Sequence, residues 1–178
     1  MRKPLTIAVG LMWAALLLGG AFRPPLPPSG TAARPDVGYM APPLTARDME
    51  GRPVSLDALR GKAVFLNFWA SWCPPCRLEM PEIEALSHQL PANAVLLTVN
   101  MTSQESSVDA VRQFLAGKGY TFPVALDPTG DTGRAYRVVS LPTSLFIGPD
   151  GRITARINGP LSGGAMLDYL KAAGRVQP

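Results

Sequence analysis

The sequence predicts an α/β domain in which helices cover both faces of a central mixed β-sheet. Two near-continuous apolar runs, residues 63–70 and 94–100, have the pattern of strands that are buried on both faces. Segments with apolar residues at helical spacing alternate with these runs, which is the order that produces parallel strands. The 178 residues and the apolar content of 47% suit one such domain with a short appendage.

The first elements of the domain are short. Turn signals at residues 50–53 surround the run 54–56 (VSL), which predicts a small β-hairpin and a helical turn as an N-terminal extension within residues 44–61. The buried strand at 63–70 comes next. A helix should follow it, from the cysteine motif to about Gln89, with a kink at Pro81 because proline removes a backbone hydrogen bond.

The second half of the domain continues the alternation. After the strand at 94–100, apolar residues at helical spacing predict a helix over 105–116, which Gly117 and Gly119 end. A Pro-Asp-Gly turn at 149–151 separates two strands of a hairpin. The remaining elements are expected at 122–126 (strand), 131–136 (short helix), 143–147 and 152–157 (strands) and 162–173 (helix).

The N-terminus reads as a targeting segment within residues 1–22. An uncharged run of eighteen residues, 5–22, is flanked by Arg2, Lys3 and Arg23. As a helix it reaches about 27 Å, the short end of a membrane span. The basic end should stay cytoplasmic, so the domain lies outside. A cleaved signal peptide is the alternative, since small residues precede a possible cleavage after Ala21. No cysteine follows the run, so a lipid-anchored form is excluded.

Residues 23–43 contain seven prolines. Proline fixes φ and removes N–H donors, so this stretch is predicted to be an extended, semi-rigid linker. The folded domain is then expected over residues 44–178. Such a spacer would hold the domain away from a membrane surface.

The formal charge of +4 does not indicate a nucleic-acid binder. Three of these net positive charges come from residues 1–43, so the domain itself is nearly neutral. A protein that binds nucleic acid carries a basic face on its folded domain, and this pattern excludes that class.

The only two cysteines lie in Trp72-Cys73-Pro74-Pro75-Cys76, where a buried strand ends and a helix begins. Covalent haem attachment needs a histidine next, and residue 77 is arginine. A zinc site would need further ligands, and His88 is the only other cysteine or histidine. A purely structural disulfide would close so small a loop that it stabilises by only about 2 kcal/mol. No metal and no cofactor are therefore expected.

Redox chemistry is the remaining interpretation of the pair. A cysteine at a helix N-terminus feels the positive end of the helix dipole, which lowers its pKa and favours the reactive thiolate. We expect Cys73 to be the exposed attacking thiol and Cys76, one turn into the helix, to be the shielded resolving thiol. Exchange would pass through a mixed disulfide on Cys73 that Cys76 then displaces. Pro74 and Pro75 fix φ at the helix start, where missing N–H groups are tolerated.

Residues 67–81 (NFWASWCPPCRLEMP) resemble the active-site stretch of the thioredoxin superfamily. More closely, the chain resembles the membrane-anchored, extracytoplasmic TlpA/ResA/CcmG-type thiol–disulfide oxidoreductases. The resemblance covers residues 42–175 and includes 141–143 (LPT) and 159–161 (GPL). It implies a thioredoxin-like fold.

The resemblance also assigns site residues. A cis-proline loop faces the two cysteines in this family, which places Pro142 in that loop and leaves the backbone of Leu141 free to pair with an extended substrate. The alternative is an ordinary trans proline that opens a strand. Trp72, Pro74 and Pro75 are expected to complete the substrate-binding surface around the sulfurs.

Two positions separate the subfamilies. Cytoplasmic thioredoxins carry a buried aspartate where this chain has Asn67, and an amide cannot relay a proton. ResA-like proteins carry a glutamate three residues after the second cysteine, matched by Glu79. A partly buried carboxylate there would shuttle protons and raise the thiol pKa values. The alternative is a solvated acid on a helix that also holds Glu82 and Glu84.

Two other interpretations are set aside. The peroxidases of this fold need a proline where Leu66 stands, so peroxidase activity is not expected. His88 is expected to be a surface helix residue.

These observations lead to one main hypothesis and two alternatives. The main hypothesis is a monomeric, single-pass thiol–disulfide oxidoreductase at the bacterial cell membrane that reduces protein substrates, such as apocytochrome c or envelope proteins. A membrane electron donor of the CcdA or DsbD kind would recharge it. The alternatives are a disulfide oxidant or isomerase, and a binding module whose disulfide is inert. Signal cleavage would make the protein secreted or periplasmic.

Overall fold

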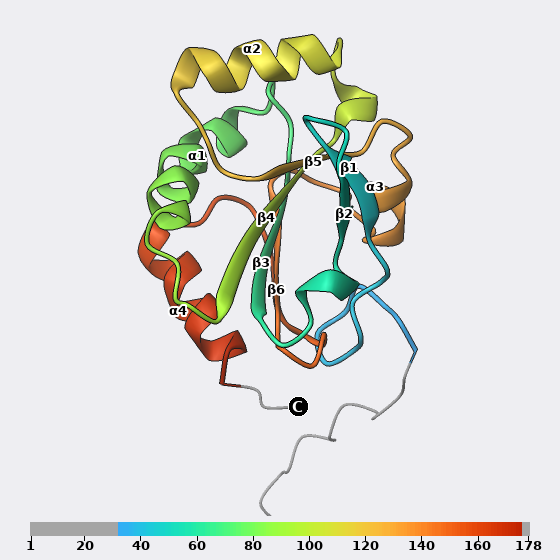
Figure 1. Ribbon diagram of the computed structural model, residues 1–178, viewed down its shortest axis with the longest axis vertical. Helices are drawn as coiled ribbons and strands as arrows, with labels where there is room; N and C mark the ends of the chain where they lie inside the picture. Colours follow the sequence, from blue (N-terminus) through green and yellow to red (C-terminus); the bar gives the residue numbers. More distant parts are fainter. Residues whose placement is uncertain (1–31, 176–178) are drawn as a thin grey trace, which may run out of the picture.

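The computed structural model describes residues 32–175, so the predicted anchor or signal at 1–22 and the first part of the linker lie outside the described residues. Seven strands form one mixed sheet in the order β2-β1-β5-β4-β3-β6-β7, with helices around it (Figure 1). The strands are β1 (Thr45–Asp48), β2 (Pro53–Ser55), β3 (Ala63–Trp69), β4 (Ala94–Asn100), β5 (Val124–Leu126), β6 (Thr143–Ile147) and β7 (Ile153–Asn158). The helices are α1 (Pro74–Ser87), α2 (Val108–Lys118), α3 (Asp131–Ala135) and α4 (Gly163–Ala173), with short 3-10 turns η1 (Asp57–Leu59) and η2 (Thr102–Gln104).

Strand β3 is the centre of the sheet, and all seven of its residues are buried. It pairs in parallel with β4, from Ala63 opposite Ala94 to Trp69 opposite Asn100. On its other side it pairs antiparallel with β6. The prediction of a mixed α/β sheet is confirmed. Because β3 and β4 are parallel and in register, the residues that follow both strands meet at one edge of the sheet.

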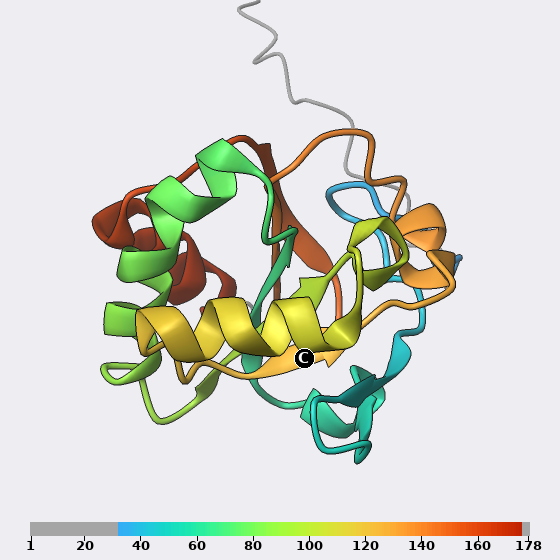
Figure 2. The same ribbon diagram turned by 90° about the horizontal axis from the view of Figure 1, so that it is seen from above.

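Alternate residues of β3 face two separate apolar cores. Phe65 and Trp69 belong to the core formed with the apolar faces of α1, α2 and α4. Leu66 and Phe68 belong to the opposite core, which Tyr136 and Leu44 help to close. Figure 2 shows α1 and α4 on one side of the sheet and α3 on the other. Helices therefore cover both faces, as expected.

Helix α2 begins later than the sequence predicts. The expected start was residue 105, but the helix runs over Val108–Lys118, and the Ser107 side chain caps it by accepting a hydrogen bond from the Ala110 N–H. The chain before it forms η2, so Glu105 is free for contacts outside the helix. The helix also passes Gly117 and ends at Gly119, whose φ of 70° is the left-handed conformation that glycine adopts without strain.

The described end of the predicted linker is packed on the domain. Gly38 N–H donates to Ile153 O over 2.8 Å, and Ile153 N–H donates to Tyr39 O over 2.9 Å. Ala41 is 6% exposed and joins the core on the side of Tyr136. This part of the predicted linker therefore packs on the domain expected from residue 44, because the start of β7 pairs with its backbone and the core takes up the side chain of Ala41. Within residues 32–175, no helix is both long enough and apolar enough to cross a membrane.

Candidate active site

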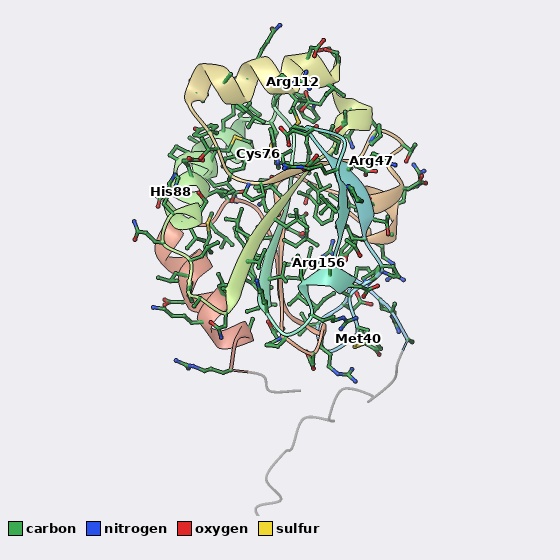
Figure 3. The ribbon with its side chains drawn as sticks, in the orientation of Figure 1. Met40, Arg47, Cys76, His88, Arg112 and Arg156 are labelled. Carbon is green, nitrogen blue, oxygen red and sulfur yellow. A yellow bond between two sulfur atoms is a disulfide. The ribbon has the colours of Figure 1, made fainter. Side chains whose placement is uncertain are left out.

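The two cysteines lie where β3 ends and α1 begins. Cys73 occupies the N-cap position of α1, and its Sγ accepts a hydrogen bond of 3.3 Å from the Cys76 backbone N–H. Pro74 and Pro75 open the helix at positions whose N–H groups would have no intrahelical partner. Cys73 and Cys76 form a disulfide, with their Cα atoms 5.3 Å apart. Figure 3 labels Cys76 near the start of α1.

The expectation of an exposed Cys73 is wrong for this disulfide form. Cys73 is 3% exposed and Cys76 is fully buried, because both side chains join the apolar core that contains Trp69 and Met80. Cys73 nevertheless lines a groove of about 280 Å³ on the surface. The other residues that line this groove are Trp72, Pro74, Pro75, Gln104, Val138, Val139, Ser140 and Leu141. A partner molecule can therefore reach Cys73 through the groove.

Two groove residues expose unusually large apolar surfaces. Trp72 is 50% exposed and Val139 is 88% exposed. They come from the loop before α1 and from the loop before β6, so apolar side chains from both loops line the groove that contains Cys73. Such a surface suits an apolar, extended segment of another polypeptide.

The loop before Cys73 is held by a carboxylate that sequence reasoning missed. Glu105 Oε1 accepts from the Ser71 backbone N–H, and Glu105 Oε2 accepts from the Ser71 hydroxyl, each over 2.6 Å. The Asn100 amide also donates to Glu105 Oε1 over 2.8 Å. The indole N–H of Trp72 donates to Gln104 O over 2.9 Å. The parallel pairing of β3 and β4 is the feature that could have indicated these contacts. The loops that follow two neighbouring parallel strands meet at the same edge of the sheet, and Ser71 and Glu105 lie in these two loops.

Glu79 lies one turn after Cys76 and is 2% exposed. Its Oε2 accepts from the Leu161 backbone N–H over 3.0 Å, and its Oε1 accepts from the Asn67 side-chain amide over 2.8 Å. Burial raises the pKa of Glu79 to about 7, although both hydrogen bonds act in the opposite direction. The interpretation of Glu79 as a solvated acid is therefore wrong, and this carboxyl can gain or lose a proton near neutral pH.

Asn67 connects Glu79 to β6. Its side-chain amide also donates to Ser144 Oγ over 3.0 Å, while its Oδ1 is buried without a hydrogen-bond partner among the described residues. Asn67 and Ser144 are paired residues on adjacent strands. Sequence reasoning named Asn67 but missed Ser144, because the pairing of β3 with β6 is not a local signal.

The loop that faces the cysteines contains the expected cis bond, Leu141-Pro142. Leu141 lines the groove, whereas Pro142 is buried. The Thr143 hydroxyl donates to Ser140 O over 2.7 Å, which holds the loop closed at the start of β6. Trp72, Pro74, Pro75 and Leu141 thus meet at the groove, and Pro142 supports it from within the fold.

The other candidates stay outside the site. His88 is exposed at the end of α1, where its Nε2 lies 2.9 Å from Glu84 Oε1. Among residues 32–175, no group of three or more histidine, cysteine, aspartate or glutamate side chains is arranged to hold a metal ion.

Comparison with known proteins agrees with this geometry. The chain matches the profile of the AhpC/TSA family over residues 37–156. It is 35% identical over 136 residues to the thiol–disulfide oxidoreductase ResA of Bacillus thuringiensis. The aligned residues make up 76% of this chain and 78% of that protein. It is 32% identical over 117 residues to the sporulation thiol–disulfide oxidoreductase A of Bacillus subtilis, covering 65% and 70% of the two chains. The crystal structure of StoA from Bacillus subtilis aligns with a TM-score of 0.67 at 28% identity, over 72% of this chain and 96% of that one. The thioredoxin-like fold is confirmed.

Proposed function

The chain belongs to the AhpC/TSA family and is a thiol–disulfide oxidoreductase of the ResA type, and from that premise we propose that it reduces disulfides in protein substrates outside the cytoplasm. The observation that carries the proposal is the position of the disulfide. Cys73 lines a groove edged by apolar side chains, while Cys76 is fully buried one turn into α1.

The reduced protein would act in two exchange steps. The Cys73 thiolate attacks one sulfur of the substrate disulfide, forms the mixed disulfide and releases the first substrate thiolate, which takes up a proton. Cys76 then loses its proton and attacks Cys73 Sγ, which forms the Cys73–Cys76 disulfide and releases the second substrate thiolate, which also takes up a proton. Two electrons have passed from the protein to the substrate, which leaves with two thiols.

Glu79 is the group that we assign to the proton of Cys76. It lies three residues after Cys76 on the same helix, and burial holds its pKa at about 7. A base with a pKa near the ambient pH is well matched to proton transfer. Before it accepts that proton, the negative charge of ionised Glu79 would raise the thiol pKa values and so make the reduced pair less reactive.

The substrate would lie in the groove. Trp72, Pro74, Pro75 and Leu141 would contact an extended segment around the substrate cysteine, and the buried cis Pro142 would present the Leu141 backbone to it. The exposed apolar side chains of Trp72 and Val139 at the groove favour a polypeptide substrate, because exposed apolar surface of this kind marks protein interaction sites.

Residues 1–22 would hold the protein in the cytoplasmic membrane, with the domain on the outer side. The support is the uncharged run at 5–22 with basic residues before it. The substrates in reach would include apocytochrome c and envelope proteins, and a membrane dithiol donor of the CcdA or DsbD kind would return two electrons to Cys73–Cys76.

The test is to replace Cys76 with serine in the native host and to isolate the proteins that become disulfide-linked to Cys73. We expect envelope proteins with cysteine pairs and one membrane donor among them. The Cys73→Ser variant is the control and should trap none. The measured reduction potential decides the direction: a value near the −270 mV of thioredoxin supports a reductant. A value near −120 mV would make the protein an oxidant, and a disulfide that resists dithiothreitol would make it an inert binding module.

A further inference from the structure

The folded N-terminal segment, residues 33–43, contacts the chain just before the groove. The Tyr136 hydroxyl donates to Pro42 O over 2.6 Å, and Tyr136 is fully buried. Tyr136 directly follows α3, which lies on the same side of the sheet as this segment (Figure 2). Two residues later the chain begins the groove wall, residues 138–141.

Arg156 on β7 joins the two stretches through one guanidinium group. Its Nη1 donates to Pro35 O over 3.1 Å and to Tyr136 O over 2.8 Å. Its Nη2 donates to Arg137 O over 3.0 Å. A planar group with several fixed donors can bind three carbonyls at once, which a single ammonium group cannot do with the same geometry. Figure 3 shows Arg156 and Met40 in the same half of the molecule, away from Cys76.

Arg137 adopts a backbone conformation that needs such support. Its φ is 47°, the left-handed region that a residue other than glycine rarely enters. Such a residue stays in the left-handed region when several surrounding contacts hold its backbone there. Here Arg156 binds its carbonyl, and the Asp36 carboxylate of the N-terminal segment lies 3.6 Å from its guanidinium.

The turn at Arg137 directs the chain into the groove wall. The next N–H, that of Val138, donates to Gly133 O over 2.9 Å. Val138, Val139, Ser140 and Leu141 then line the groove beside Cys73. A change in the conformation of Arg137 would therefore move the wall and leave the cysteine pair on α1 in place.

We propose that Arg156, supported by residues 33–43, is a positioning residue that holds the 138–141 wall of the groove in the geometry that accepts a polypeptide substrate. The proposal rests on the proposed function, since it concerns the same groove. It assigns the N-terminal segment a part in substrate binding in addition to its part in the fold.

The test compares Arg156→Met with Arg152→Met in the full-length chain in detergent micelles. Arg152 is the matched control: its Nη1 also binds the N-terminal segment, at Gly38 O over 3.1 Å, and its contacts do not include Tyr136 or Arg137. The probe is a synthetic extended peptide with one internal disulfide, reduced in a single turnover by the pre-reduced protein. We expect Arg156→Met to raise the half-saturating peptide concentration about five-fold at a nearly unchanged maximal rate, and Arg152→Met to behave as the parent protein.

Two further measurements separate positioning from general damage. The alkylation rate of Cys73 by iodoacetamide, a reagent too small to need the wall, should be the same in all variants. Amide hydrogen exchange at Val138 should be faster in Arg156→Met than in Arg152→Met. If Arg156→Met does not fold, Asp36→Asn is used in its place. We then expect the half-saturating peptide concentration to rise about two-fold, because a single exposed ion pair contributes less free energy than the three hydrogen bonds of Arg156.

The proposal is overturned by an unchanged half-saturating concentration in the Arg156 variant, or in Asp36→Asn where that variant stands in for it. It is also overturned by equal effects of the Arg156 and Arg152 variants, or by an altered alkylation rate of Cys73. If the proposed function itself is wrong, the parent protein reduces no peptide at all. Hydrogen exchange at Val138 still decides in that case whether Arg156 holds residues 138–141 in place.

Discussion

The side-chain amide of Asn67 donates a 2.8 Å hydrogen bond to the Oε1 atom of Glu79, and both residues are buried. An amide in this place cannot accept the proton of the carboxyl as an aspartate could. It stabilises the ionised form of Glu79 against the effect of burial, which leaves the pKa of Glu79 at about 7.

The first prediction concerns the pH dependence of stability. Glu79 titrates at about 4.5 when unfolded and at about 7 when folded. The folded state thus binds more protons between these values, and stability is lost as the pH rises through this window. In Glu79→Gln this loss should be absent. We expect the free energy of unfolding of the oxidised parent protein, relative to Glu79→Gln, to fall by about 3 kcal/mol from pH 4 to pH 8.

Denaturant unfolding at several pH values measures this difference. Glu82→Gln, an exposed residue on the same helix, is the control and should follow the parent protein. Parallel curves for the parent protein and Glu79→Gln would contradict the assignment of a raised pKa.

The second prediction concerns Asn67. Asn67→Ala removes a hydrogen bond that lowers the pKa of Glu79, so the carboxyl should stay protonated to a higher pH. Infrared titration of the Glu79 carboxyl stretch checks this shift. Ser144→Ala removes the other acceptor of the same amide and should move the titration much less. A lower pKa in Asn67→Ala would show that the amide does not stabilise the carboxylate.

The third prediction concerns the carboxylate that holds the loop before Cys73. Glu105→Ala removes three hydrogen bonds to a charged acceptor and leaves the buried amide of Asn100 without this partner. We expect a loss of about 2–4 kcal/mol in the free energy of unfolding, together with faster hydrogen exchange at the Ser71 amide. Glu50→Ala, an exposed residue of the β1–β2 hairpin, is the control. Unchanged exchange at Ser71 would mean that the loop is held without Glu105.

The fourth prediction separates substrate binding from stability. Val139 is 88% exposed and lines the groove, so Val139→Ser should change the free energy of unfolding by no more than about 0.5 kcal/mol. The half-saturating concentration of a disulfide peptide should rise about three-fold, because an apolar contact with the substrate is lost. Leu78→Ser is the matched control, because Leu78 is 75% exposed on α1 and does not line the groove. Equal effects of the two variants would remove Val139 from the binding surface.

Local patterns in the sequence were sufficient for most of the fold. The apolar runs predicted β3 and β4 to within one residue, because strands buried on both faces need continuous apolar side chains. The position of the cysteine pair at a strand–helix junction also followed from the sequence, since Pro74 and Pro75 are suited to the first positions of a helix. The predicted start of α2 at residue 105 is too early, because the Ser107 hydroxyl caps the helix and so begins it at Val108.

The contacts that give the site its chemistry join residues far apart in the chain. Asn67 meets Ser144 across 77 positions, and Arg156 meets Pro35 across 121. Sequence alone determined which residues could carry out thiol exchange, because the type and spacing of Cys73 and Cys76 are properties of a short segment. Only the tertiary structure decided how deeply Cys73 is buried, what pKa Glu79 has and what supports the groove. Burial and hydrogen-bond partners depend on which elements pack together, and no single segment of the chain contains that information.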